Sequence, residues 1–546
     1  MKRISKRIII VLGILFIILK GVEWWLEHNF NKRINSNPDR AYNLEYDDFD
    51  LHTGLKGITL DKVRIRPLKK VDGAATIIGD VDYATLSGLV WADLLFGKTL
   101  NIDEIAFEQP VFEITLKTDS VKKDSSSGIQ DMFGDILSRA DLRSFSIQNG
   151  SMILKEPESG KTKGQISKIN IVASELETDS VQLKHFIPFK LGNLVVEIDN
   201  IKFDLNEYTH LSLSQINYDL RKKEISLKNL SMGYSIDWVA VSEKIGIQND
   251  VIELSVKEIS ISELEPSSRF YSHLDIQAQK LLIDSLDIKL QRNKNLNRPP
   301  DAVKPMFNGM ISAIPIAVEL DSIQILNSTL TYRELGVNKD ESGSISLKNI
   351  DGIIEGFTNI PKKQKSVGQL EALLTAKLNG FASMDIDLIV PYNKEAFQLS
   401  LVMGQMELEK FNPMLIPLAG VEVKSGELKR LKYQMHAGLH QSKNKVIFDY
   451  SDFHVTLIKE KENHKFKKRP IITLIGDALI KHNNLPDHHN YLMASYESNR
   501  NIYRSPVNYI IHGLVEGAAR IVPGKNIGKM ITKDKEEKKK KKKSKD

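Results

Sequence analysis

Apolar and polar residues alternate with a period of two along most of the chain from about residue 42 onward. Because successive side chains of a strand point to opposite faces, the alternation predicts strands with one apolar and one hydrated face, as in an antiparallel sheet. Short polar breaks with the composition of hairpin turns separate the runs at Asn149-Gly150, Asn249-Asp250 and Ser425-Gly426. Periodicity alone is equally compatible with an open sheet and with closed β-sandwiches, whose apolar face is a filled core.

Helical spacing of apolar residues occurs only in short patches, which predict helices over residues 89–96, 129–137, 303–314 and 507–522. The second and third of these helices begin an internal repeat with an offset of 178 residues. At that offset the segment from Ser146 to Glu156 aligns with the segment from Gln324 to Glu334. A short helix, a hairpin and a further strand therefore recur as a unit.

The chain opens with four basic residues among its first seven, followed by the unbroken apolar run from Ile8 to Leu19 and by Trp24 and Trp25. As a helix, the stretch from Ile8 to Leu26 would reach about 28 Å, close to the thickness of a hydrocarbon core. No small-residue cleavage site follows it, and the Trp pair suits a membrane interface. The pattern therefore favours an uncleaved transmembrane anchor over a cleaved signal peptide or a buried helix, with the remaining chain exported.

The formal net charge of +6 belongs to the two ends of the chain. The first seven residues carry +4 and residues Lys533 to Asp546 carry +5, whereas the 63 basic and 66 acidic residues between them give −3. The body of the chain thus predicts no nucleic-acid partner. The Lys-rich tail is of low complexity and is predicted to be a solvated segment, with attraction to anionic lipid headgroups as the alternative.

Candidate catalytic chemistry is sparse. Cysteine is absent, which excludes disulfides, thiol catalysis and Cys-ligated metals. Gly97-Lys98-Thr99 looks like the end of a phosphate loop, but Ala92 stands where the first Gly is needed. His436 and His440 have metal-like spacing, yet on a predicted strand that spacing does not converge. We therefore predict no enzyme, no metal and no cofactor.

Three blocks of the sequence carry a family resemblance. They are Gly57 to Ile65, Leu86 to Phe112 with its Gly97-Lys98 and Pro110, and Leu408 to Pro413 followed by Ala419-Gly420 and Ser425 to Leu428. In this order they resemble AsmA-like proteins, the bacterial members of the bridge-like lipid-transfer group that includes TamB and chorein-type proteins. The resemblance covers most of the chain, and each block is mainly hydrophobic spacing with a Gly or Pro.

The resemblance implies a mainly β fold: a transmembrane helix, then a long twisted antiparallel sheet folded into an apolar groove, with a few short amphipathic helices. It also implies a single-pass inner-membrane protein whose body lies in the periplasm of a Gram-negative-type bacterium. There it would carry phospholipids between the inner and outer membranes, with an outer-membrane or periplasmic protein as a possible partner. The alternative is a periplasmic scaffold or assembly factor for outer-membrane components, and an envelope enzyme is a third hypothesis.

The groove candidates are apolar residues of predicted strands, and each has an equally good interpretation as core. They are Ile102, Ile105, Phe107, Ile114, Phe145, Ile147, Met152, Ile323, Ile325 and Leu330. Six segments are expected along the chain. They are a basic start and anchor (1–28), an AsmA-like N-terminal β region (29–120), a first repeat (121–300), a second repeat with an AsmA-like C-terminal β region (301–505), an amphipathic helix (506–532) and a disordered Lys-rich tail (533–546).

Overall fold

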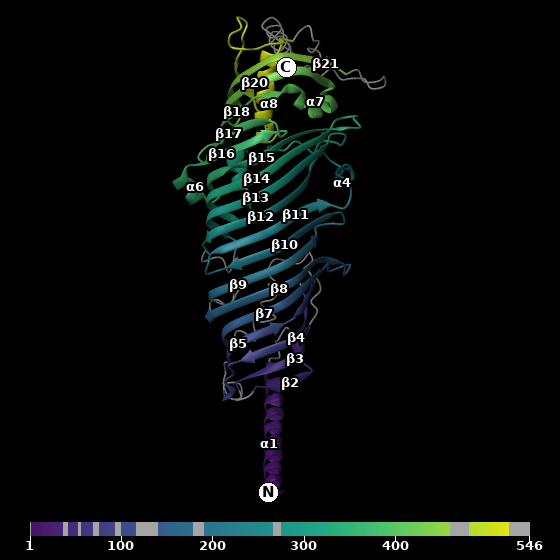
Figure 1. Ribbon diagram of the computed structural model, residues 1–546, viewed down its shortest axis with the longest axis vertical. Coiled ribbons are helices and arrows are strands. Elements are labelled where there is room, and N and C mark those ends of the chain that lie inside the picture. Colours follow the sequence, from purple (N-terminus) through teal and green to yellow (C-terminus); the bar gives the residue numbers. More distant parts are fainter. Residues whose placement is uncertain are drawn as a thin grey trace. The chain divides into compact units, whose positions relative to one another are not determined.

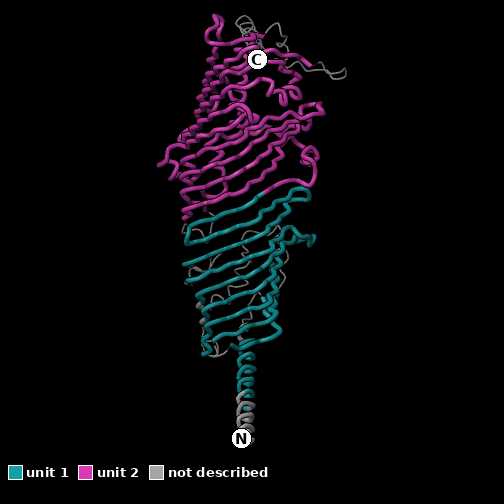
Figure 2. Tube along the Cα trace, in the orientation of Figure 1, with its two compact units in different colours: residues 1–230, 266–274 teal, residues 231–265, 275–546 magenta. Residues whose placement is uncertain are grey.

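The computed structural model describes residues 2–35, 42–52, 56–68, 76–92, 100–115, 140–177, 190–265, 275–458 and 480–523. Its chain divides into two compact units, coloured separately in Figure 2. Unit 1 comprises residues 1–230 and 266–274, and unit 2 comprises residues 231–265 and 275–546. Within each unit, successive strands lie side by side in a sheet (Figure 1). The predicted mainly β class is confirmed.

Unit 1 begins with one long helix and continues with strands. Its elements are α1 (Lys2–Ile34), β1 (Tyr42–Glu45), β2 (Asp48–Leu51), β3 (Gly57–Pro67), β4 (Thr76–Ser87), β5 (Leu100–Glu108), β6 (Val111–Thr115), β7 (Ala140–Lys155), β8 (Thr162–Glu177), β9 (Lys190–Asp204), β10 (Thr209–Asp219) and β11 (Glu224–Tyr234), whose last residues belong to unit 2. β3 pairs with β1, β2 and β4, β4 pairs with both β5 and β6, and antiparallel pairs then join β7 through β10.

Unit 2 combines long strands with short helices. Its elements are α4 (Trp238–Ile245), β12 (Asp250–Leu264), β13 (Asp275–Asn293), α5 (Phe307–Ser312), β14 (Ala317–Leu335), β15 (Ser342–Thr358), α6 (Pro361–Val367), β16 (Gln369–Leu378), β17 (Ala382–Pro391), β18 (Phe397–Met403), β19 (Met406–Glu407), the 3₁₀ helix η2 (Leu408–Phe411), α7 (Asn412–Ala419), β20 (Val421–Ala437), β21 (Gln441–Leu457), β22 (Ala494–Asn499) and α8 (Pro506–Ile521). The strands pair in chain order, except that both β18 and β19 pair with β20.

The prediction of a purely antiparallel sheet is wrong at one place in each unit. β7 runs parallel to both β5 and β6, and β14 runs parallel to β13. Each parallel pair needs a crossover connection, and in unit 2 residues 294–316 supply it. The helix predicted over 303–314 lies in this crossover and shortens to α5, whereas the helix predicted over 129–137 lies outside the described residues. A period of two does not distinguish the two strand directions.

The three predicted hairpin turns are also wrong. Asn149 lies in the middle of β7 with φ at +52°, and Gly426 lies in the middle of β20; both mark irregularities of the strand pairing. Asn249 precedes β12 and follows α4 rather than a strand. A β-bulge with a left-handed residue needs the same Asn and Gly chemistry as a tight turn, so composition alone does not separate them.

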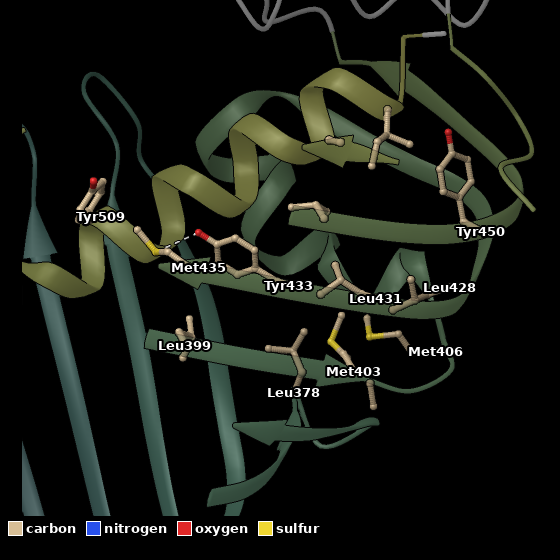
Figure 3. Packing of buried hydrophobic residues seen from close by; sticks show 14 of the residues in the cluster. Leu378, Leu399, Met403, Met406, Leu428, Leu431, Tyr433, Met435, Tyr450 and Tyr509 are labelled. Atoms are coloured by element: carbon tan, nitrogen blue, oxygen red, sulfur yellow. Dashed lines mark hydrogen bonds between the residues drawn. The ribbon is translucent and has the colours of Figure 1, made fainter. Parts of the chain in front are cut away.

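Two clusters of buried side chains form the cores. The N-terminal core belongs to unit 1 and joins the apolar residues of β2 to β5 with Phe30 of α1, whose ring lies 5.8 Å from that of Phe49. The C-terminal core belongs to unit 2 and joins β16 to β21 with α8. Figure 3 shows part of this second core, where Tyr433 and Met435 lie beside Tyr509 of α8.

Among the described residues, no helix is both long enough and apolar enough to cross a membrane. The predicted transmembrane segment therefore has no support from the structure. The first half of its apolar run, from Ile8 to Gly13, lies outside the residues whose side chains are described, so the anchor stays a prediction. The end of α1 is attached to unit 1, because Asn35 both donates to and accepts from the backbone of Leu44 on β1.

Candidate functional site

A continuous apolar face crosses the strands of unit 2, and its continuity depends on bulges. β16 alternates regularly, so Leu374 and Leu378 share one face of the sheet. Their partners on β15 are Gly352 and Leu347, which therefore share that face although they are five positions apart, an odd number. Asn349, with φ at +50°, lies between the two and supplies the extra residue that restores the alternation.

The same register continues from β15 to β14, β13 and β12, because directly paired residues share a face. Ser285 and Asn327 occupy the equivalent left-handed positions on β13 and β14. The apolar face of unit 2 consists of Ile252, Leu254, Val256, Ile259 and Ile261 on β12, Leu281, Ile283, Leu286, Ile288 and Leu290 on β13, Ile323, Ile325, Leu330 and Tyr332 on β14, and Ile345, Leu347 and Ile354 on β15. Without the bulges, half of these side chains would point to the hydrated face.

This face is covered over part of its extent and open over the rest. Toward β18 and β20 it is buried in the C-terminal core, where Met403, Leu431 and Tyr433 lie. On β12 to β14 most of its side chains remain partly exposed, and Ile252 is 37% exposed. None of these residues belongs to either core among the described parts of the chain. A large apolar surface that the chain leaves open is typical of a binding surface.

A row of charged side chains borders the open face at one end of the strands. The row follows the pairing from Asp250 through Arg292 to Glu334, next to the apolar pair of Leu290 and Tyr332. Two hydrogen bonds of 2.6 and 2.7 Å join the guanidinium of Arg292 to the carboxylate of Asp250. The Tyr332 hydroxyl donates to Glu334 at 2.6 Å, and burial together with this bond raises the pKa of Tyr332. These groups satisfy one another and form a polar rim.

Unit 1 has an apolar face of the same construction. Its members are paired directly from strand to strand across β7, β8, β9 and β10. They are Phe145, Ile147, Met152 and Leu154 on β7, Ala173, Ile171, Ile166 and Gly164 on β8, Leu194, Val196, Ile201 and Phe203 on β9, and Tyr218, Leu213 and Leu211 on β10. Asn149 and Asn200 are the left-handed residues here. The Asn149 amide donates to the side chain of Asn170, as the Asn327 amide donates to Asp351 in unit 2, both at 2.8 Å.

The ten sequence candidates fall on these apolar faces or on the strands paired with them, but in different environments. Ile102, Ile105 and Phe107 are buried in the N-terminal core, where Ile102 is 1% exposed. Ile114, Phe145, Ile147 and Met152 are partly buried against that core. Ile323 is buried, whereas Ile325 and Leu330 remain partly exposed outside both cores.

The structure also identifies open apolar residues that the candidate set omitted. Leu254 on β12 pairs with Ile288 on β13, Leu290 on β13 pairs with Ile252 on β12, and all of them are at least partly exposed, as Leu330 is. The sequence signal for them was present, because the alternation on β13 skips from Ile283 to Leu286 around Ser285. That three-residue step in an otherwise period-two pattern marks a bulge that keeps one face apolar.

One group of side chains in the described residues has the spacing of a cation site. Carboxylate oxygens of Asp48, Asp50 and Asp61 lie within 4.8 Å of one another on β2 and β3. The first two of these residues are exposed, and exposed acidic groups commonly lie close together without an ion. No family model and no curated protein matches this chain.

Proposed function

We propose that this chain is an AsmA-like lipid carrier, in which phospholipid acyl chains lie on the open apolar faces and move from strand to strand. The observation that carries the proposal is the partly exposed face on β12 to β14, whose apolar residues stay in register from strand to strand. A filled core would instead bury these residues as it does those of β18 and β20. The further elements of the proposal are inner-membrane anchoring and a periplasmic body.

The dimensions of the open face fit an extended acyl chain. From Ile252 to Ile261 the face covers nine residue steps of β12, about 30 Å at about 3.3 Å per residue. Across the strands, β12 to β14 add about 10 Å at about 4.8 Å per spacing. An acyl chain of about fourteen methylenes gains about 11 kcal/mol from leaving water, at about 0.8 kcal/mol each. The face thus offers lipid an apolar surface in place of water.

The chemistry of the face suits movement rather than tight binding. Its members are almost all Ile, Leu and Val, which contact an acyl chain without directional preference. The charged groups at its rim are already paired: Arg292 binds Asp250, and Glu334 binds Lys294 and accepts from the Tyr332 hydroxyl. A surface without a preferred stopping point lets a lipid shift by one strand at little change in free energy.

The proposed membrane anchor would use apolar side chains of α1 that do not pack on unit 1. Phe16, Ile17, Ile18 and Leu19 are all more than half exposed, and Trp24 farther along is 67% exposed. Farther on, Phe30 turns into the N-terminal core. The exposed apolar segment of α1 can thus lie in lipid, while its C-terminal end at Phe30 is packed on the strands of unit 1.

The alternative, a scaffold or assembly factor, is favoured by the filled C-terminal core. There the apolar face of β16 to β21 is closed by α8 and packs as an ordinary protein interior. A scaffold would bind a protein on the open face of β12 to β14, and photo-crosslinking distinguishes the two.

The test places a photo-crosslinking amino acid at Leu330 or at its neighbour Thr331, which points to the opposite face of β14. After illumination in cells, we expect phospholipid adducts at position 330 and few at position 331. Adducts of protein alone at position 330 would support the scaffold. Equal lipid labelling at both positions, in folded protein, would exclude the open face as the lipid path.

A further inference from the structure

A polar cleft lies in unit 2 where β17, β18, β20, β21 and β22 are side by side. Its volume is about 330 Å³, which is in the range of small-molecule sites. The charged and amide side chains that line it are Lys394, Gln398, His436, Gln441, Lys443 and Glu497. All six follow β16 in the chain, so the cleft is separate from the open apolar face on β12 to β14.

The strand pairing brings four of these side chains into one row. Gln398 on β18 pairs with His436 on β20, His436 pairs with Lys443 on β21, and Lys443 pairs with Glu497 on β22. Directly paired residues share a face of a sheet, and their side chains lie close together. The neighbouring row, which begins at Phe397, is buried on the opposite face. The row of four therefore lies on the face directed away from the C-terminal core.

The two lysines of the cleft are not neutralised by the described part of the chain. Lys289 and Glu253 are directly paired on β13 and β12 and form an ion pair of 3.3 Å. Lys443 and Glu497 have the same relation on β21 and β22, yet within the described residues neither makes an ion pair. Lys394 also makes none there. Both ammonium groups thus remain available to a ligand.

A third positive charge contacts the turn between β20 and β21, which forms part of the cleft wall. Arg500 is 7% exposed, its guanidinium donates to the carbonyls of Leu439 and Lys304, and its Nε has no hydrogen-bond partner in the described chain. The carboxylate of Glu395 acts on this charge from beyond ion-pair distance. Because a buried charge is weakly screened, it adds to the potential of the surface nearby. Positive charge therefore exceeds negative charge around the cleft.

We propose that this cleft binds a phosphate group, either free or as the phosphodiester of a lipid headgroup. The ammonium groups of Lys394 and Lys443 would bind its oxygens, and the side-chain N–H groups of Gln398 and His436 would donate to them. A phosphate group spreads its negative charge over several oxygens, so it can use donors that converge from several strands. The site is independent of lipid transfer along the open apolar face.

The test measures binding of inorganic phosphate to the detergent-solubilised full-length protein by isothermal titration calorimetry. At a salt concentration of about 0.15 M, which screens weak surface attraction, wild-type protein should bind phosphate saturably with a Kd of about 1 mM or less. Lys443→Gln should weaken binding about fivefold or more, whereas Glu497→Gln should tighten it about two- to fivefold because a like charge is removed. The matched control is Lys377→Gln, which changes an exposed lysine on the same face of the sheet outside the cleft and should leave binding unchanged.

A second titration identifies the source of the phosphate group. Its probe is glycerophosphoglycerol, a lipid headgroup without the acyl chains that the open apolar face would bind. A headgroup site should bind this diester at least as tightly as inorganic phosphate, whereas a site for free phosphate should bind inorganic phosphate alone.

Three outcomes overturn the proposal. The first is no saturable binding of either probe to wild-type protein below about 10 mM. The second is binding that Lys443→Gln leaves unchanged. The third is weaker binding in both Lys443→Gln and Glu497→Gln, because removal of an acid from an anion site does not weaken it unless the fold is lost.

Discussion

Replacing Gly513 by Ala tests how tightly α8 is held on the sheet. The added methyl would clash with the hydroxyl of Tyr433 and lie 3.1 Å from Oδ1 of Asn444. These two groups share a buried hydrogen bond of 2.9 Å, so the methyl has no room unless the bond breaks. Overpacking costs about 1–3 kcal/mol and the lost buried bond about 1–3 kcal/mol, offset by about 1 kcal/mol of helix propensity. We expect a net local loss of about 3 kcal/mol.

Hydrogen exchange measures this loss directly. A loss of about 3 kcal/mol corresponds to roughly hundredfold faster exchange of the α8 amides, since 1.4 kcal/mol is tenfold, while the strands of unit 1 should be unaffected. The control is Gly21→Ala in α1, where an added methyl meets no atom within 4 Å and should stabilise the helix by up to about 1 kcal/mol. Unchanged α8 exchange in Gly513→Ala would refute the close packing of α8 on the sheet.

Three further predictions concern other parts of the chain. Tyr46→Phe should be neutral or stabilising by up to about 1 kcal/mol at pH 7, because the buried Tyr46 hydroxyl has no hydrogen-bond partner among the described residues. Burial, with a smaller effect of Glu27, raises the pKa of Tyr46 to about 12, whereas a tyrosine of the unfolded chain ionises near pH 10. The stability of the wild-type protein should therefore fall between pH 10 and 12. Thermal denaturation should show a smaller fall for Tyr46→Phe. Asn327→Val should cost about 1–2 kcal/mol in urea denaturation and Asn327→Gly much less, because φ is +50° there. Phe30→Ala should lower the free energy of unfolding by about 3–5 kcal/mol and speed proteolysis near the C-terminal end of α1. A clearly smaller loss of stability would exclude Phe30 from the N-terminal core.

The sequence predicted strands where apolar and polar residues alternate with a period of two, as they do on β5, β10 and β12. It also predicted α8: the helical spacing over 507–522 matches Pro506–Ile521, whereas the segment expected over 506–532 extends into residues that the structure does not describe. In the strands and in α8 the local pattern has one interpretation. Apolar residues at every second position indicate a strand, and apolar residues at intervals of three and four positions indicate a helix. Strand direction was missed because it depends on where a connection returns, as residues 294–316 do between β13 and β14.

Burial was the second property that the sequence did not predict. Phe107 and Leu330 have the same kind of alternating environment in sequence, yet one is buried in a core and the other stays open. What separates them is whether another element covers the sheet at that point, which is a long-range contact. The apolar face of a strand is encoded locally, whereas its cover is not.

The bulges link the repeat in the sequence to the continuity of the apolar faces. Asn149 and Asn327 lie 178 residues apart, both have a left-handed backbone, and both interrupt the pairing with the following strand at matching positions. A strand of fifteen or more residues that lost this extra residue would send half of its apolar side chains to the hydrated face. Such an error in one strand of a packed core would be a local defect, but on an open face it would break the apolar path at that strand. The recurrence of the same bulge in both units therefore keeps the apolar residues of these long strands on one face.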